Sequence, residues 1–575
     1  MIDLIINGKE AVLPKEFSFE YIAENRAFTE ADDYSLNIEL PLAGCPQNIG
    51  IFGHINRFDS DTDTIVYTCE IRALNFYRYG SLTITDISEN SIKVQFLGDK
   101  SAQNFLSTFD DIYINELNLG SPNSIAHNSF PRNYRNGFDS GAEYVVLPWC
   151  NNASGIIQND IVGGREWAYT EAFTPAAQMY LLHLTESICE QLGYRWDFSE
   201  WYDSCYRHLI VCNALPLSWK QPDFAKALPR WSVTEFFEQL GLFLYGEFDI
   251  NHDKKTISFS FYRNIALNYP IVKLDNILNE ISVEISKETC SYRDSRVLKY
   301  ANNGAVTEHF YACDWYISQF KDKAVSLDKM ESLMDRAREI YLKLDGQTPP
   351  NSLYYVAEYD CYFILSWRSA TGISVPSGIG YITQDGNSYH IVPINRFAPS
   401  HTDEDAEEDE IKIVPVPIEF TDESHQFCIF LNPGAEEIES SEVKTIPEIQ
   451  LAEGDKSKTS TYENIYVGFW EPDFFELIEP PYPHPLVDYH YFQNILYYHH
   501  YDNTLCLRNN PLRQSVHNID GKTKYTIKFL STELPNPRSV FVIEGKKYLC
   551  ESISTTFTHN GMSDVHKGVF YRIID

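Results

Sequence analysis

The sequence predicts a mainly β, multidomain protein with α+β parts. The chain has 575 residues, too many for one core, and at about 150 residues per domain it suggests roughly three to five domains. It carries 38 Tyr and 35 Phe, and aromatic residues favour strands. Short alternating segments separated by turn residues recur through residues 1–125, a pattern typical of barrels and sandwiches.

The stretch YSLNIELPLAGCPQNIGIFGHINRF, residues 34–58, begins with alternating apolar and polar residues. A polar turn is expected at residues 46–48, followed by a second apolar piece at 49–55. The pattern predicts two edges of a β-domain joined by a loop. The apolar positions of the first strand are Tyr34, Leu36, Ile38 and Leu40.

Three more strands are predicted in the same region, at residues 65–74, 81–87 and 91–96. The turn signals that separate them are Tyr79-Gly80 and Glu89-Asn90.

Three helices are predicted further along the chain. The first covers residues 175–192, with Thr174 as its cap, Pro175 in the first helical position and Gly193 at its end. The second covers residues 232–240, where Ser232 and Glu235 form a capping box before Gly241. It leads into a strand, a turn and a strand over residues 242–262. The third covers residues 326–344, with an apolar stripe that Gly346 closes.

The later part of the chain carries two segments that we expect to be mobile. The acidic block TDEDAEEDE, residues 402–410, is expected to project from a solvated loop. Residues 435–460 lack aromatic side chains and are interpreted as a long loop or linker. A tyrosine-rich tract at residues 489–501 follows, and then a C-terminal β-unit from Lys524 onwards.

Together these patterns predict five consecutive regions. They are an N-terminal β-barrel domain (1–125), an α+β domain with two capped helices and a hairpin (126–300), a second β-rich domain with the third helix and the acidic loop (301–434), the linker (435–460), and a final region with the aromatic tract and the C-terminal β-unit (461–575).

The net charge limits the partners of the protein. Lys and Arg total 46 against 81 Asp and Glu, so the formal charge is 46 − 81 = −35. Binding to DNA or anionic lipid needs clustered Lys and Arg, and this balance argues against it. Protein partners remain open, as does nucleic acid that slides past an acidic surface.

The cysteines and the N-terminus indicate the compartment. No two of the twelve cysteines have zinc-knuckle or thioredoxin spacing, so we interpret them as mostly buried free thiols in a reducing compartment. The start of the chain lacks the basic and apolar regions of a signal peptide. No stretch approaches the roughly twenty apolar residues that span a bilayer. We expect a soluble protein made in the cytoplasm.

One segment has the alternating acids of a calcium loop. In DINHDKK, Asp249, Asn251 and Asp253 stand at alternate positions, but Lys254 replaces the required Gly and Ser260 the required Glu. A polar hairpin turn is the preferred interpretation.

A group of histidines lies in and near the tyrosine-rich tract. Their spacings match no helical metal pair and no zinc knuckle, so packing at an aromatic interface is preferred over metal binding. The four are His484, His490, His499 and His500.

Motifs for nucleotide binding and nucleophilic catalysis are incomplete. Gly521-Lys522-Thr523 has Val516 where a phosphate loop requires Gly, so it is interpreted as a turn before a strand. No Gly-x-Ser-x-Gly elbow occurs, and PSGIGYIT at 376–383 is interpreted as a glycine-rich turn. We therefore predict no catalytic, cofactor-binding or metal-binding residues and no cofactor, although paired catalytic carboxylates can meet in space without a sequence signal.

Several separate stretches resemble one family. Residues 34–58 resemble an N-terminal pattern in tail or baseplate hub proteins of phages and prophages of Bacteroidetes-type hosts: an alternating strand, Leu-Pro, an Asn, Ile-Phe-Gly and a basic residue. TPAAQMYLLHLTESICEQLGYRWDF and WSVTEFFEQLGLFLYGEFDINHDKKTISF resemble the helix and hairpin units of those proteins. Residues 541–573 resemble their C-terminal unit. The acidic block and the linker do not match the family pattern.

The resemblance implies a non-catalytic structural hub that joins the tail tube to the tail tip. Such hubs form rings and carry paired β-barrel domains that continue the tube, with extra domains outside. The expected partners are other copies of the chain in a ring, most simply a trimer, the tail tube, and tail-tip or spike proteins. DNA would be transiting cargo only, with no stable membrane association. The expected location is the host cytoplasm during assembly and then the virion tail.

Two alternatives and one detail of the hub interpretation remain open. The tyrosine-rich tract also fits a glycan- or receptor-binding tail-tip module, and a cell-wall hydrolase fused to a hub is the enzymatic alternative. For the hub, the −35 charge predicts a channel lined by acid, because a basic lining would hold DNA through its phosphates. The strand edges of residues 1–125, including the loop at 41–48, are expected to contact neighbouring subunits.

Overall fold

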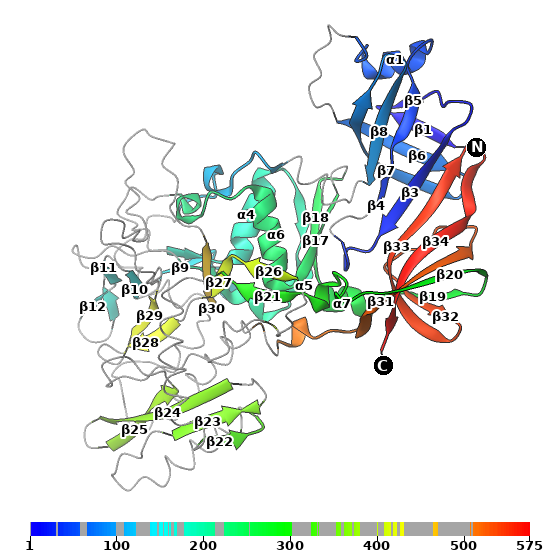
Figure 1. Cartoon of the computed structure of the whole chain (residues 1–575). Helices are drawn as coiled ribbons and strands as arrows, with labels where there is room; N and C mark the ends of the chain where they lie inside the picture. The colour runs from blue at the N-terminus through cyan, green and yellow to red at the C-terminus, as the bar shows by residue number, and fades with distance from the viewer. Residues whose placement is uncertain are drawn as a thin grey trace.

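A computed structural model of the chain has one large composite sheet beside a mixed α/β region (Figure 1). The residues that the structure describes are 2–29, 33–57, 66–98, 109–121, 138–146, 177–212, 223–251, 254–301, 407–415 and 510–574, with short stretches at 149–152, 155–158, 160–162, 166–168, 324–329, 332, 352–357, 361–370, 373–379, 400, 418–421, 426–430, 464–469 and 507.

The N-terminal unit is an antiparallel sheet around an apolar core. Its strands are β1 (Asp3–Ile6), β2 (Lys9–Glu10), β3 (Ser18–Glu24), β4 (Asp33–Ser35), β5 (Ile38–Pro41), β6 (Tyr67–Ala73), β7 (Phe76–Ile87) and β8 (Ser91–Gly98). Alternate residues of β8 are buried, and Ile92, Val94 and Phe96 are fully enclosed in the core. This is the two-residue period that the sequence pattern predicts.

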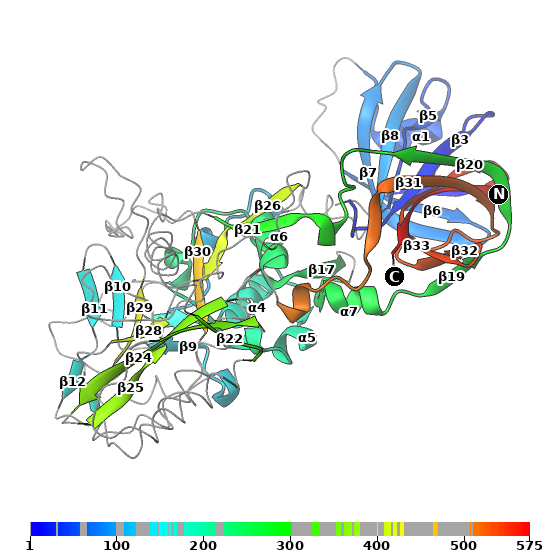
Figure 2. The ribbon, with the colours of Figure 1, turned by 60° about the horizontal axis from the view of Figure 1, so that its bottom comes forward.

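The C-terminal unit has six strands, two of which come from the middle of the chain. They are β19 (Ile271–Leu274), β20 (Ile277–Ile285), β31 (Ile519–Leu530), β32 (Val540–Ile543), β33 (Lys546–Thr558) and β34 (Gly561–Ile573). β19 pairs with β32, and β20 pairs with β31 at the opposite side of the unit. Since only two residues separate β19 from β20, one continuous segment links both sides, and the strands curve around a shared core (Figure 2).

The two units form one hydrogen-bonded sheet, which we call the β platform. β3 pairs with the end of β33, from Ser18 opposite Thr558 to Glu24 opposite Ser552. The start of β33 pairs instead with β32. The long hairpin β33–β34 therefore belongs to both units, and the two ends of the chain meet in the same sheet.

The α+β domain packs around a second core beside the platform (Figure 1). Figure 1 shows helices α4 and α6 at its centre with strands on either side. Its elements are η1 (Ile114–Glu116), η2 (Phe138–Ser140), β9 (Tyr144–Val146), β14 (Ala177–Met179), α4 (Leu181–Gln191), β15 (Arg195–Asp197), α5 (Ser199–Tyr202), η3 (Cys205–His208), β16 (Leu209–Val211), η4 (Phe224–Ala227), α6 (Val233–Leu244), β17 (Gly246–Asn251), β18 (Thr256–Phe261), α7 (Tyr262–Leu267), η5 (Arg293–Ser295), β21 (Val297–Tyr300), β26 (Glu408–Ile411), β27 (Ile413–Pro415), β30 (Ile465–Phe469) and η9 (Pro511–Arg513).

The remaining strands form small sheets. One is ordered β11–β10–β29–β28, another β22–β23–β24–β25, and β12 pairs with β13. Their bounds are β10 (Trp149–Asn152), β11 (Gly155–Gln158), β12 (Asp160–Val162), β13 (Glu166–Ala168), β22 (Val325–Leu327), β23 (Ser352–Val356), β24 (Cys361–Ala370), β25 (Ile373–Ile379), β28 (Ile418–Thr421) and β29 (Gln426–Phe430). The prediction of a mainly β protein with α+β parts is confirmed.

Residues 46–52 form a helix, so two predictions are wrong here: the polar turn at residues 46–48 and the second β edge at residues 49–55. Helix α1 covers Pro46–Phe52, and Pro46 suits a first helical turn. The side chain of Asn48 is buried and binds two neighbouring segments: its Oδ1 accepts from the Val12 nitrogen at 2.8 Å, and its Nδ2 donates to the carbonyls of Val12 at 2.9 Å and Pro41 at 2.8 Å. The polarity of Asn48 therefore serves an internal contact.

The predicted alternation from Tyr34 to Leu40 is also broken. The backbone leaves the strand geometry between β4 and β5, at Leu36 and Asn37, and this break changes which residues face the core. Leu36 is exposed, whereas Ser35 is buried and its Oγ accepts from the Phe96 nitrogen at 2.9 Å. Only Ile38 and Leu40 keep the predicted inward side.

The turn predicted at Tyr79-Gly80 is wrong, because β7 continues through both residues. A Cβ on Gly80 would lie 2.0 Å from the Leu97 carbonyl oxygen of β8. The glycine therefore allows two strands to approach closely within the sheet, which a sequence pattern cannot distinguish from a turn. The turn at Glu89-Asn90 is confirmed.

The first predicted helix starts later than expected. Residues Ala177–Met179 form strand β14, which pairs with β9, and α4 begins at Leu181. Pairing with a distant strand thus replaces the first helical turn that Pro175 suggested, while Thr174 and Pro175 lie outside the described residues. The predicted end is confirmed, since Gly193 follows α4 with a φ of +74°, a conformation that favours glycine.

The second predicted helix is confirmed at its start and extended at its end. The Ser232 hydroxyl accepts from the Glu235 nitrogen at 3.1 Å, which is one half of the predicted capping box. Gly241 lies inside α6, and the helix ends at Leu244, four residues later than predicted, where Tyr245 caps it with a φ of +54°. The following hairpin of β17 and β18 is confirmed.

Three later predictions concern segments that the structure describes only in part. The third helix begins in strand β22, which is a correction for residues 326 and 327, and most of residues 328–344 lie outside the described part of the chain. Residues 408–410 of the acidic block form strand β26, paired in parallel with β21, so a solvated loop is wrong there. The segments 402–406, 435–460 and 489–501 lie outside the described residues.

The partners of β19 and β20 show that the C-terminal unit includes residues from the middle of the chain. Both strands lie before residue 300, in the region predicted as the α+β domain, yet their backbone partners are C-terminal strands. The C-terminal unit is therefore discontinuous in sequence. The other domain boundaries stay predictions.

Seven cysteines whose side chains the structure describes are free thiols. Five of them, Cys45, Cys69, Cys189, Cys212 and Cys550, are buried, and burial raises the pKa of the Cys69 and Cys550 thiols. Within the described segments, no helix has the length and apolar character needed to cross a bilayer.

Candidate functional site

A buried ionic cluster lies where the β platform meets the α+β domain. Glu247 of β17 accepts on one oxygen, Oε1, from the Nη1 of Arg26 at 2.5 Å and from the Nη2 of Arg538 at 2.8 Å. Arg26 follows β3 and Arg538 precedes β32. The side chains of Arg26 and Glu247 are 9% and 10% exposed. One carboxylate thus binds both units of the platform to the α+β domain.

The charges of the cluster determine the protonation state of Glu247. Burial alone would raise the pKa of its carboxyl, but the positive charges of Arg538, Arg26 and Arg293 lower it to about 2. Glu247 is therefore ionised throughout the physiological range. We call Arg26, Glu247, Arg293 and Arg538 the junction cluster.

Arg293 connects the cluster to a second group of contacts. Its guanidinium carbon lies 3.2 Å from the centroid of the Tyr262 ring. Its Nη2 donates to the Arg26 carbonyl at 2.8 Å, and its backbone nitrogen donates to the Ala27 carbonyl at 2.7 Å. A guanidinium that stacks on a ring and donates hydrogen bonds in its plane is held in one orientation.

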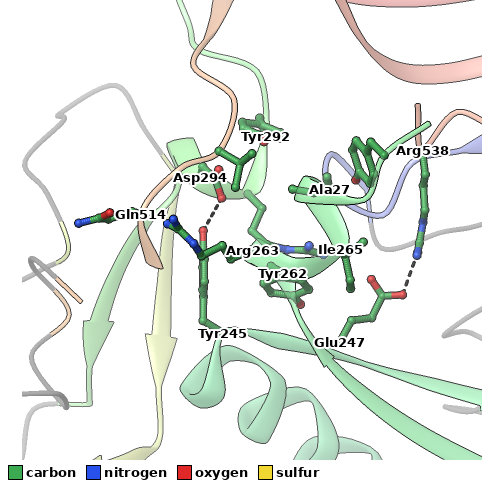
Figure 3. A pocket seen from close by; sticks show the side chains of 14 residues that line it. Ala27, Tyr245, Glu247, Tyr262, Arg263, Ile265, Tyr292, Asp294, Gln514 and Arg538 are labelled. Carbon is green, nitrogen blue, oxygen red and sulfur yellow. Dashed lines mark hydrogen bonds and ion pairs between the residues drawn. The ribbon is translucent and has the colours of Figure 1, made fainter. Parts of the chain in front are cut away.

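Tyrosine hydroxyls complete the wall of the site (Figure 3). The Tyr245 hydroxyl donates to Asp294 Oδ1 at 2.5 Å. Burial, together with the charge of Asp294, raises the pKa of Tyr245 well above its ordinary value. Arg513 donates to the Phe243 carbonyl at 2.5 Å at the end of α6, where helical carbonyls lack partners within the helix.

Local structure explains why these side chains converge. Tyr245 caps the end of α6 and β17 begins at the next residue, so Tyr245 and Glu247 lie close together at the corner between helix and strand. Strand β18 passes directly into α7, which places Tyr262 beside them. Arg26 and Arg538 come from loops of the platform that face this corner.

The space around the cluster is small on one side and open on the other. A cavity of about 20 Å³ lies between Tyr245, Tyr262 and Arg293, enough for about one water molecule. A cleft of about 610 Å³ lies on the other side, where Glu247 and Arg538 face Asp33 and Arg78 of the N-terminal unit. Arg78 Nε donates to Asp33 Oδ2 at 2.8 Å.

The charged groups of the junction cluster bind one another across the boundary between the platform and the α+β domain. Glu247 is ionised and pairs with Arg26 and Arg538. This arrangement restrains the orientation of the segments that carry it, because removing one partner leaves a buried charge uncompensated.

The residues that the sequence suggested for metal binding are not brought together. Asp249 and Asn251 lie on β17, and Asn251 Oδ1 accepts from the Lys254 nitrogen at 2.8 Å, so the hairpin interpretation is confirmed there. Asp253 and the four histidines lie outside the described residues. Within the described ranges, no group of three or more His, Cys, Asp or Glu side chains is placed to hold a metal ion.

The two glycine-containing motifs are strands where they are described. Residues 521–523 lie inside β31 at an irregularity in its pairing with β34, so the interpretation as a turn before a strand is wrong. Residues 376–379 belong to β25, which corrects the glycine-rich turn, and residues 380–383 lie outside the described part.

Sequence reasoning missed the junction cluster. Its members are separated by between 46 and 512 positions, so no local motif joins them. The strand GEFDIN alternates Glu247, Asp249 and Asn251 with Phe248 and Ile250, so its pattern predicts that Glu247 faces solvent and gives no signal of a buried ion pair.

Comparison with known proteins finds only loose likenesses, all of them to solved structures. No family model matches the chain, and no curated protein matches it. Among solved structures, the 43 kDa tail protein of prophage MuSo2 from Shewanella oneidensis has 7% sequence identity and a TM-score of 0.28, covering 100% of this chain and 97% of that one. The tail protein from Neisseria meningitidis MC58 has 7% identity and a TM-score of 0.27, covering 99% and 96%. Overlap at this level adds nothing to the fold described above.

Proposed function

We propose that this protein is a non-catalytic structural component of a phage or prophage tail, a baseplate hub that joins the tail tube to the tail tip. The observation that carries the proposal is the pairing of β3 with β33, which makes the two terminal β-units one sheet. The resemblance of residues 34–58 and 541–573 to hub proteins concerns these same two units. Paired β-domains are also what that resemblance leads us to expect.

Within this proposal, the junction cluster fixes the orientation of the α+β domain relative to the platform. A hub must hold its outer domains at a constant orientation while other proteins bind to it. Three arginines around one buried carboxylate restrain orientation well, because each charge is costly to separate from its partner.

The proposal includes a ring, most simply of three copies, with a channel lined by acidic residues. The partners are the tail tube and tail-tip or spike proteins, and DNA passes through without lasting contact. Assembly in the host cytoplasm precedes incorporation into the virion tail. The −35 charge supports an acidic lining, which repels a duplex over about 10 Å at roughly 0.1 M salt.

Immunogold labelling of purified phage particles tests the tail assignment. Antibody against this chain should mark the end of the tail distal to the capsid. Label on the capsid, or particles that lack the chain by mass spectrometry, would contradict it.

Light scattering on the full-length protein tests the ring. The expected mass is that of three copies, and a strictly monomeric protein at high concentration argues against self-assembly. A ring structure with a basic channel would refute the acidic lining separately from the tail assignment.

A further inference from the structure

Strand β20 lies at the rim of the C-terminal unit (Figure 2) and carries a row of exposed apolar side chains. Ile281 is 51% exposed, Val283 53% and Ile285 79%. The three alternate along the strand, so they lie on one face. Exposed apolar side chains scattered singly are ordinary, but a row of them on one strand marks a contact surface.

The exposed row lies on the same face of the sheet as the C-terminal core, next to the last core residues. Ile281 lies opposite Ile527 of β31, which is buried in the core, and Val283 lies opposite Tyr525, which packs against it. Directly opposed residues share a face. The face that forms the core therefore extends along β20 as far as Ile285, and no layer of the described part of the chain covers it there.

The backbone edge of β20 is open as well. In the described sheet, β20 pairs with β31 on one side and ends the strand order there. The other end is different, since β2 is two residues long and α1 covers it: Gln47 donates to the Glu10 carbonyl at 2.8 Å and Lys9 to the Gly50 carbonyl at 3.3 Å. A long apolar edge left unprotected is a template for an added strand.

The charges beside this edge select the strand that would be added. Glu280 and Glu284 alternate with the apolar row and are exposed, and Glu280 also forms an ion pair with Lys528 of β31. Glu284 lies opposite Lys524, whose ammonium is already 3.6 Å from Glu551. Pairing two copies of β20 about Ser282 would set Glu280 of each copy opposite Glu284 of the other, and like charges in that position are destabilising.

We infer that β20 is a docking edge for an extended segment of a partner protein whose side chains alternate between apolar and basic. The apolar side chains cover Ile281, Val283 and Ile285, and the basic ones meet Glu280 and Glu284. The inference goes beyond the proposed function, because it concerns a surface outside the junction cluster and holds for any assembly that contains this chain.

Fluorescence anisotropy with two labelled peptides tests the inference on the full-length protein. One peptide alternates valine and lysine over the length of β20, and the other alternates valine and glutamate. The lysine peptide should bind at least about tenfold more tightly than the glutamate peptide. Equal binding of the two peptides would overturn the inferred partner chemistry.

Substitutions locate the binding to the edge. Val283→Lys should weaken binding of the lysine peptide by about tenfold or more, since it removes apolar contact area and adds a like charge. The matched control is Leu74→Lys, which changes a side chain that is 94% exposed in the turn between β6 and β7 and should leave binding unchanged. If Val283→Lys does not fold, Ile285→Ser replaces it.

A charge reversal separates specific pairing from general attraction to an acidic protein. Glu284→Lys should shift the preference from the lysine peptide towards the glutamate peptide, whereas Glu89→Lys, in an exposed turn of the N-terminal unit, should not. Identical effects of the two reversals would overturn the inference. So would self-association that Val283→Lys abolishes, because the edge would then belong to a second copy of the chain.

Discussion

The two halves of the β platform and the α+β domain are joined by contacts of different kinds. Between the platform units, β3 and β33 share a backbone ladder, and Phe557 stacks on Phe19 with ring centroids 5.1 Å apart. Between the platform and the α+β domain, the junction cluster around Glu247 lies beside a small apolar cluster, in which Phe28 packs on Tyr292 with ring centroids 5.0 Å apart. The first junction is made of a backbone ladder and apolar groups, and the second combines buried charges with a smaller apolar contact.

The difference predicts how each junction fails. A ladder that shares its core with both units can be lost only when those units unfold. A buried ion pair contributes little net stability compared with apolar packing, but removing one partner leaves an uncompensated charge. The junction cluster can therefore loosen while the domains on either side stay folded.

The largest effect is expected at the backbone junction. Phe557 is fully buried and also packs against Tyr21 and Phe76. Phe557→Ala should lower the free energy of unfolding by about 3–5 kcal/mol. Urea unfolding followed by tryptophan and tyrosine fluorescence measures this, with Tyr77→Ala, at an exposed position, as the control. A loss below about 1 kcal/mol would show that the two units do not depend on this contact.

The next effect concerns the charged junction. Glu247→Gln leaves Arg26 and Arg538 facing each other without a counter-charge, which should cost about 3 kcal/mol. Small-angle scattering should show a broader range of sizes while circular dichroism stays unchanged. Asp249→Asn, two residues along the same strand, is the matched control. If the variant unfolds as a whole, the charged junction cannot loosen while the domains stay folded, and the predicted difference between the two junctions is wrong.

The pH dependence of this junction follows from the pKa of Glu247. Its folded-state value of about 2 lies below the ordinary 4.5, so its contribution is complete above about pH 4.5 and is lost as pH falls towards 2. The stability difference between the natural protein and Glu247→Gln should shrink from about 3 kcal/mol near pH 6 towards zero near pH 2. Denaturant unfolding at a series of pH values checks this, and a constant difference would contradict the ionised state.

The smallest effect is expected for a partly exposed pair away from both junctions. Arg296 Nη1 lies 3.3 Å from Asp409 Oδ2 between η5 and β26, with both side chains about one-fifth exposed. Asp409→Asn should lower stability by less than about 1 kcal/mol, and salt should reduce the difference further. Thermal unfolding at low and high salt measures it, with Glu410→Gln as the control. A loss of stability as large as that expected for Glu247→Gln would contradict the prediction that a partly exposed ion pair contributes less than a buried one.

Local signals were reliable where neighbouring residues alone decide the structure. Ser232 begins a helix and Gly193 ends one as predicted, because a cap and a left-handed residue act within one turn of the chain. The hairpin after α6 has the same origin, in a polar turn between apolar strands. The mainly β class followed from alternation and aromatic content.

Signals failed where a distant segment competes for the same residues. Ala177–Met179 pair with β9 instead of starting a helix. Gly80 lies within β7, where the Leu97 carbonyl oxygen of β8 leaves no room for a Cβ. Asn48, interpreted as a turn residue, instead satisfies the backbone of Val12 and Pro41. In each case the deciding partner lies far away in the sequence.

The sequence by itself determined the acidic character, the β-rich class, the helix caps and the positions of several strands in the N-terminal unit. Only the tertiary structure decided that β19 and β20 complete the C-terminal unit, that β3 joins the two units, and that Glu247 meets Arg26 and Arg538. Caps and alternation depend on interactions within a few residues, which a pattern records directly. Ladder pairing and buried charge compensation depend on which distant segments share a core, and that arises only when the whole chain has folded.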